Sequence, residues 1–62
     1  MYSYEINVSR RGGHHHLMRL PVACREDALD FLTEAREAWK AEDGFECTLY
    51  RTEAPSRVRI KA

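Results

Sequence analysis

The sequence contains few cysteines and no long apolar run. It contains two cysteines, Cys24 and Cys47, which are too few for a disulfide framework. No apolar run approaches the roughly 20 residues that a membrane-spanning helix needs. Residues 2–9 alternate between apolar and polar side chains and lack the charged and apolar segments of a signal peptide. These absences predict a cytoplasmic protein without a membrane partner.

Signals for catalysis and for cofactor binding are also lacking. Three glycines are present, and the pair Gly12-Gly13 joins two predicted strands instead of opening a helix, so it is not a phosphate-binding loop. Half of the ten carboxylates lie on a predicted solvent-facing helix, where burial cannot prepare them for acid–base catalysis. The sequence therefore predicts no cofactor and no enzymatic activity.

The chain is short, but its composition is that of a folded domain. Its 62 residues are 44% hydrophobic and regularly patterned, which argues against intrinsic disorder. A chain of this length buries only about 60% of the surface that it exposes when unfolded. We expect one domain over residues 1–62, with a small free energy of unfolding that a partner would increase.

Residues 25–41 have the pattern of one amphipathic helix. Apolar side chains recur there with a period of about 3.6 residues and form a stripe: Ala28, Leu32, Ala35 and Trp39. Leu29 and Phe31 flank this stripe, and the opposite side is polar. Cys24 takes the N-cap position, and Gly44 is expected to end the helix.

Four other segments alternate with a period of two and are predicted strands: residues 2–9, 14–20, 45–52 and 57–61. Gly12-Gly13 predicts a tight hairpin turn between the first two strands, and residues 53–56 resemble a turn between the last two. Pro21 cannot donate to a ladder, so the second strand should end there or lie at an edge.

These elements predict an α+β fold, β-β-α-β-β, with a four-stranded, mostly antiparallel sheet and one helix packed on one face. A right-handed crossover makes the second and third strands parallel to each other. If the first strand lies between them, all neighbours are antiparallel and the spatial order is 2-1-3-4. The opposite face of the sheet then stays uncovered.

The charge is zero overall but unevenly placed. Residues 25–43 carry three basic and seven acidic side chains, a net charge of −4, whereas residues 1–24 and 44–62 each have +2. Arg36 and Lys40 are expected to pair with Glu37 and other carboxylates at helical spacing. An acidic helix face can be merely solvated, or it can dock on a basic surface of another protein, imitating phosphates if that surface normally binds nucleic acid.

Two apolar residues on the uncovered face, Leu17 and Tyr50, are candidates for a second contact surface. A second copy of the chain could also cover this face, which would make a homodimer. The candidate partner-binding residues of the helix and the sheet are therefore Glu26, Asp30, Glu34, Glu37, Leu17 and Tyr50.

Basic residues on the uncovered face suggest an alternative function. Small antiparallel sheets bind single-stranded nucleic acids by stacking bases on aromatic rings beside basic side chains. Tyr50 is the one aromatic residue there, and a charged edge strand explains the same pattern without a ligand. The candidate nucleic-acid-binding residues are Arg19, Arg57, Arg59 and Lys61.

The run His14-His15-His16 is the remaining candidate for a chemical role. Alternation places His14 and His16 on the helix-facing side of the second strand, roughly 7 Å apart, and His15 on the other side. Two imidazoles are fewer than the ligands that a zinc site needs, and Cys47 is the nearest further candidate. A polar hairpin arm explains the run without a metal, so no metal site is predicted.

No motif of a known family can be recognised in the sequence. In length, element order and lack of a cofactor signature, the chain resembles the small accessory proteins that phages and mobile elements encode against host machinery. That resemblance implies an inhibitor or regulator of a larger host protein. We therefore expect a small non-enzymatic protein-binding module, with a nucleic-acid-binding domain as the alternative.

Overall fold

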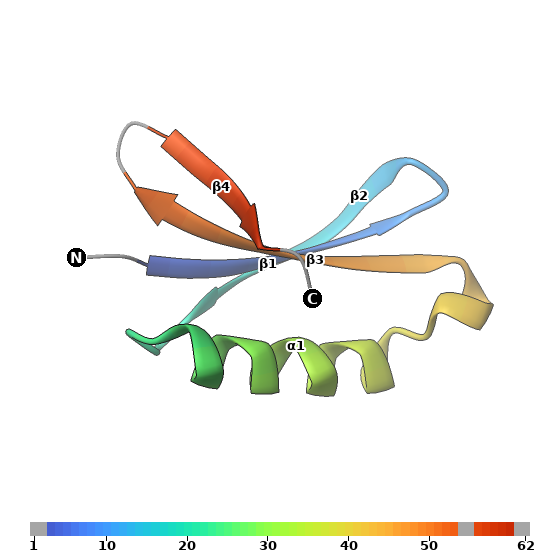
Figure 1. Cartoon of the computed structure of the whole chain (residues 1–62). Helices are drawn as coiled ribbons and strands as arrows, with labels where there is room; N and C mark the ends of the chain where they lie inside the picture. The colour runs from blue at the N-terminus through green and yellow to red at the C-terminus, as the bar shows by residue number, and fades with distance from the viewer. Residues whose placement is uncertain (1–2, 54–55, 61–62) are drawn as a thin grey trace.

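The computed structural model describes residues 3–53 and 56–60 and has one helix packed on one face of a four-stranded sheet (Figure 1). Its elements are β1 (Ser3–Arg10), β2 (Gly13–Leu20), α1 (Arg25–Ala38), a short 3-10 helix η1 (Ala41–Asp43), β3 (Phe45–Glu53) and β4 (Ser56–Ile60). This confirms the predicted α+β fold and its β-β-α-β-β order. Within the described ranges, no helix is long and apolar enough to cross a membrane.

The strand order is β2-β1-β3-β4, and every neighbouring pair is antiparallel. The predicted order 2-1-3-4 is confirmed. β1 occupies a central position because every second side chain along it is buried and both of its edges are paired. β2 ends at Leu20, directly before Pro21, and forms one edge of the sheet, as the missing donor of proline predicts.

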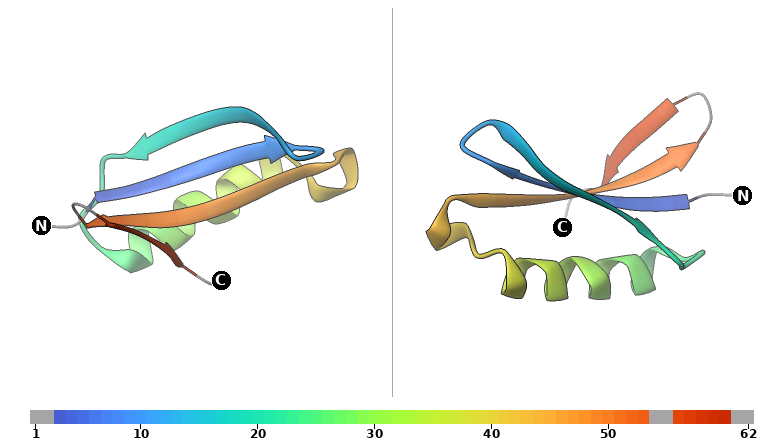
Figure 2. Two further views of the ribbon diagram at one scale, coloured as in Figure 1. Left: turned by 90° about the horizontal axis from the view of Figure 1, so that it is seen from above. Right: turned by 180° about the vertical axis from the view of Figure 1, so that it is seen from behind.

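The core lies between α1 and the strands that it crosses, β1 and β3 (Figure 2). It consists of nine buried residues: Tyr4, Ile6, Val8, Leu20, Ala28, Leu32, Ala35, Cys47 and Leu49. Full burial of an aliphatic side chain such as Leu32 contributes roughly 1.5–3 kcal/mol. The predicted helix stripe is therefore the helix side of the core, although Trp39 is only half-buried against it.

The helix ends earlier than the sequence predicts. α1 stops at Ala38, and Trp39 already has an extended conformation with φ −115° and ψ 90°. Gly44 does have a left-handed φ of 89°, but it ends the separate 3-10 helix η1 instead of α1. No helix-breaking residue precedes Gly44, so the turn toward β3 is imposed by packing and not by local sequence.

The first hairpin turn is displaced by one residue from its predicted position. Arg11 and Gly12 are the two turn residues, with φ of 52° and 80°, while Gly13 already belongs to β2. A two-residue hairpin loop requires positive φ at both central positions to match the twist of the strands. Gly12 meets this requirement without strain, whereas Arg11 meets it against the preference of a side chain with a Cβ.

A β-bulge at His15 overturns the predicted alternation of the three histidines. His16 lies opposite Val8 and His14 opposite Ser9, so His15 is the extra residue on β2. A bulge interrupts the alternation of side chains. His15 and His16 consequently both contact Trp39 on the helix side, and His14 contacts Asn7 on the open side. The prediction that His14 and His16 share the inner face is therefore wrong.

Parts of three predicted elements lie outside the described residues. They are Tyr2 of the first strand, Lys61 of the fourth, and Ala54-Pro55 of the second turn.

The displaced turn yields a prediction with a matched control. Gly12→Ala should lower the free energy of unfolding by about 1–2 kcal/mol, because its φ of 80° is unfavourable for a residue with a Cβ. Gly13→Ala should leave stability unchanged or slightly raised, because the added Cβ would lie 3.5 Å from the Arg10 carbonyl oxygen, an ordinary contact. Urea denaturation of both variants measures the difference. Equal losses would show that the turn is centred elsewhere.

Candidate functional site

The open face of the sheet is organised around Glu5 at the centre of β1. The Glu5 side chain is only 12% exposed. The Thr52 hydroxyl donates a hydrogen bond of 2.6 Å to its Oε1. The guanidinium groups of Arg57 on β4 and Arg19 on β2 approach its carboxylate oxygens at 3.6 and 3.9 Å. One carboxylate therefore pairs with two cations that come from the two outer strands.

Two of the predicted nucleic-acid-binding residues are held in this arrangement. Besides pairing with Glu5, Arg57 places its guanidinium carbon 4.5 Å from the centre of the Tyr50 ring. Tyr50 is half-buried and has a cation over its ring, so that face of the ring is not free to stack on a base. Arg59 is exposed opposite Tyr50, and Lys61 lies outside the described residues.

The two apolar candidates of the open face lie on different strands. Leu17 is 41% exposed on the edge strand β2, and Tyr50 is on β3, with β1 between them. Leu17 pairs with Asn7, whereas Tyr50 pairs with Glu5. The side chains around these two positions are polar or charged, so Leu17 and Tyr50 do not form one apolar patch.

The acidic face of α1 is exposed and unpaired within the described ranges. It carries five carboxylates, which are Asp27 and the four predicted partner-binding residues of the helix: Glu26, Asp27, Asp30, Glu34 and Glu37. The expected local pairs do not form. Arg36 instead donates to the Cys47 carbonyl oxygen at 3.4 Å, and Lys40 pairs with Glu42 at 3.9 Å. Arg36 is drawn toward β3 because it lies on the flank of the helix that faces this strand.

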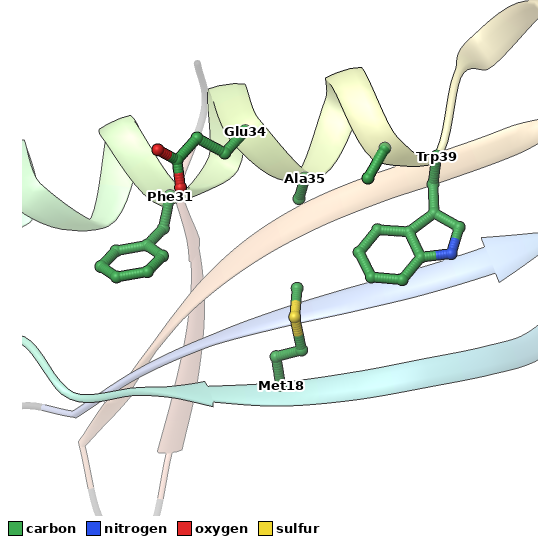
Figure 3. A pocket seen from close by; sticks show the side chains of 6 residues that line it. Met18, Phe31, Glu34, Ala35 and Trp39 are labelled. Carbon is green, nitrogen blue, oxygen red and sulfur yellow. The ribbon is translucent and has the colours of Figure 1, made fainter.

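A groove that the sequence does not predict lies between α1 and β2. It has a volume of about 170 Å³, and Figure 3 shows the Met18 side chain pointing from β2 toward the helix between Phe31 and Trp39. Ala35, Ala38 and Glu34 also line the groove on the helix side, and Glu34 is the one charged residue among the described residues of this lining. The sequence feature that indicates this groove is Phe31, an aromatic residue beside the helix stripe. In the structure it is 37% exposed.

His15 and His16 form an aromatic cluster with Trp39 and Phe45 at one end of this groove. The His16 ring stacks on Trp39 with 5.8 Å between the ring centres, and His15 packs edge-on against Phe45 at 5.0 Å. His14 is on the opposite face of the sheet. In the part of the chain that the structure describes, no three His, Cys, Asp or Glu side chains are grouped so that they could hold a metal ion.

Cys24 and Cys47 are both free thiols with different surroundings. Cys24 is exposed at the N-cap of α1 and makes no capping hydrogen bond with its side chain. Cys47 is buried on β3, and its thiol lies 3.9 Å from the Trp39 carbonyl oxygen. Burial raises the pKa of the Cys47 thiol above its ordinary value, and the nearby Arg36 cation opposes part of this shift.

Comparison with known proteins gives no relative from which a role could be transferred. No protein-family model matches the chain, and no curated protein or solved structure matches it. Three surfaces of the protein are therefore the candidates for its function: the open face around Glu5, the acidic face of α1, and the groove between α1 and β2.

The Glu5 cluster should be important for stability. Glu5→Ala should lower the free energy of unfolding by about 1–3 kcal/mol, because it removes the acceptor of Thr52 and leaves Arg19 and Arg57 unbalanced. The control is Glu53→Ala, which breaks the exposed pair with Arg51 and should cost about 1 kcal/mol or less. Thermal or urea unfolding compares them. Equal effects would mean that Glu5 is no more than a surface charge.

The two thiols should react at different rates. In the folded protein near neutral pH, iodoacetamide should modify Cys24 first, because Cys47 is buried and its raised pKa keeps it protonated. Since only the thiolate reacts, modification of Cys47 should accelerate as the pH rises toward its raised pKa. Mass spectrometry over time measures both sites, and Cys24→Ser should remove the fast phase. A fast phase that persists in this variant would contradict the burial of Cys47.

Proposed function

We propose that this chain is a small non-enzymatic protein-binding module that docks the acidic face of α1 on a basic surface of a larger protein. Binding of this kind inhibits or regulates by occupying the surface and requires no chemistry from the module. The proposal fits a host-directed accessory protein, the class that the chain resembles in size and element order.

The observation that carries the proposal is the contrast between paired and unpaired charges. The sheet arginines Arg19 and Arg57 both pair with Glu5, whereas the five carboxylates of the acidic face have no ion pair among the described residues. Unpaired exposed charges of one sign attract a complementary surface and accelerate association with it.

The nucleic-acid alternative has weaker support. A single-strand platform needs free aromatic faces beside unpaired cations. Here Arg57 lies over the ring of Tyr50 and also pairs with Glu5. The same cluster makes the open face polar, which also gives a homodimer little apolar surface to bury.

Affinity capture with two charge-matched variants tests the proposal. The bait is the full chain, in lysate of the native host that is divided into a nuclease-treated and an untreated half. The helix variant changes four carboxylates of α1 to amides: Glu26→Gln, Asp30→Asn, Glu34→Gln and Glu37→Gln. The control makes the same change in net charge at exposed carboxylates outside α1: Glu42→Gln, Asp43→Asn, Glu46→Gln and Glu53→Gln. Circular dichroism confirms that both variants are folded.

We expect one stoichiometric protein to be recovered with the natural sequence and with the control, and its recovery to fall on the order of tenfold with the helix variant. Added salt should weaken the capture, because exposed charges are screened. Equal recovery with the helix variant would refute the role of α1. Recovery that disappears with nuclease would instead favour nucleic acid, with Arg59→Glu as the variant to test next.

A further inference from the structure

The two edges of the sheet differ in how well they are protected. β4 is a five-residue strand with Arg57 and Arg59, and Figure 1 shows it angled away from the rest of the sheet. Short, charged, twisted edges resist the addition of another strand. β2 has eight residues, and from Gly13 to Met18 it contains no Lys, Arg, Asp or Glu. The edge of β2 is therefore the more accessible template for a further strand.

The bulge divides β2 into two parts. It disturbs the ladder near the hairpin turn, whereas Leu17 to Leu20 pair regularly with β1. In this regular part, Met18 and Leu20 face the helix side, and Leu17 and Arg19 face the open side. An added strand would continue this alternation, so every second side chain would point to the helix side, where the groove lies.

The side of α1 that borders the groove carries two acidic side chains and one aromatic side chain. Phe31 and Glu34 line the groove, and Asp27, four residues before Phe31, lies on the same side of the helix beyond the lining. Their spacing along the helix axis is about 6 and 4.5 Å. Alternate side chains of a strand are about 6.6 Å apart. The spacing of Asp27, Phe31 and Glu34 along the helix is therefore roughly that of three successive helix-facing side chains on an added strand.

We propose that the edge of β2 accepts an extended segment of a protein partner as a fifth strand, with the sequence pattern basic-x-apolar-x-basic. Main-chain hydrogen bonds to Leu17–Leu20 would hold the segment. Its apolar side chain would enter the groove beside Met18 and Phe31, and its basic side chains would meet Asp27 and Glu34. This inference rests on the proposed function, because it assigns the partner's binding segment to one edge of the acidic surface.

Selection from a peptide library tests the pattern directly. Random displayed peptides of about nine residues, long enough for one strand, are panned against the immobilised full chain. We expect enrichment of the basic-x-apolar-x-basic pattern. Failure to enrich peptides, or enrichment of acidic ones, would overturn the proposal. A dimer of the free chain joined through β2 would also overturn it, because a second copy would then occupy the edge.

An enriched peptide, synthesised and labelled, then probes the site. Glu34→Lys should raise its Kd on the order of tenfold or more, whereas Glu37→Lys, an equal charge change outside the groove lining, should have a much smaller effect. Phe31→Ser should also weaken binding, and because Phe31 is 37% exposed the variant is expected to fold. Equal effects of Glu34→Lys and Glu37→Lys would overturn the specific seating in the groove.

Hydrogen exchange of the complex locates the added strand. Amides of residues 17–20 that point outward should exchange quickly in the free protein and slow on peptide binding, while those of β4 stay unchanged. Protection of β4, or of no strand, would exclude strand addition at β2. If the capture experiment succeeds and this one fails, the acidic face of α1 remains the docking surface and only the strand addition is lost.

Discussion

The packing of one helix on the two central strands is the contact on which the rest of the structure depends. Leu32 is flanked on the inner face of α1 by Ala28 and Ala35, whose small side chains let the helix backbone approach the sheet. A helix about 10 Å wide covers roughly two strands spaced 4.8 Å apart. β1 and β3 are therefore covered, and the two outer strands extend beyond the helix. The groove beside β2 follows from this mismatch in width.

The same geometry divides the charges of the molecule into two groups, those that pair on the open face of the sheet and those that, within the described ranges, stay unpaired on the helix. On the open face, side chains from adjacent strands lie close enough to balance one another, and Glu5 gathers Arg19 and Arg57. On the helix, the cations leave the acidic face: Arg36 turns to the carbonyl of Cys47, and Lys40 pairs beyond the end of α1. The uncompensated charge thus resides on the surface that is convex and most accessible to another protein.

Period-two and helical patterns predicted the element order, and the strand order followed once β1 was given the central position. The bulge at His15 could not be predicted, since the alternation of apolar and polar residues does not mark where the register with β1 shifts. The early end of α1 depends on Trp39 packing against His15 and His16, which are distant in sequence. The candidate acidic residues were predicted from charge alone. Their lack of partners, and the groove, required the tertiary structure.

The central position of β1 has a consequence for how the chain folds during synthesis. β1 and β2 are adjacent in sequence and can pair as soon as both have been made, but the other edge of β1 pairs with β3, about 40 residues later. Until residues 45–53 are available, the side chains of Ile6 and Val8 have neither their second strand nor a docked helix to cover them. A chain that has made β1 and β2 but not β3 therefore leaves apolar side chains uncovered, and exposed apolar surface of this kind favours aggregation or chaperone binding.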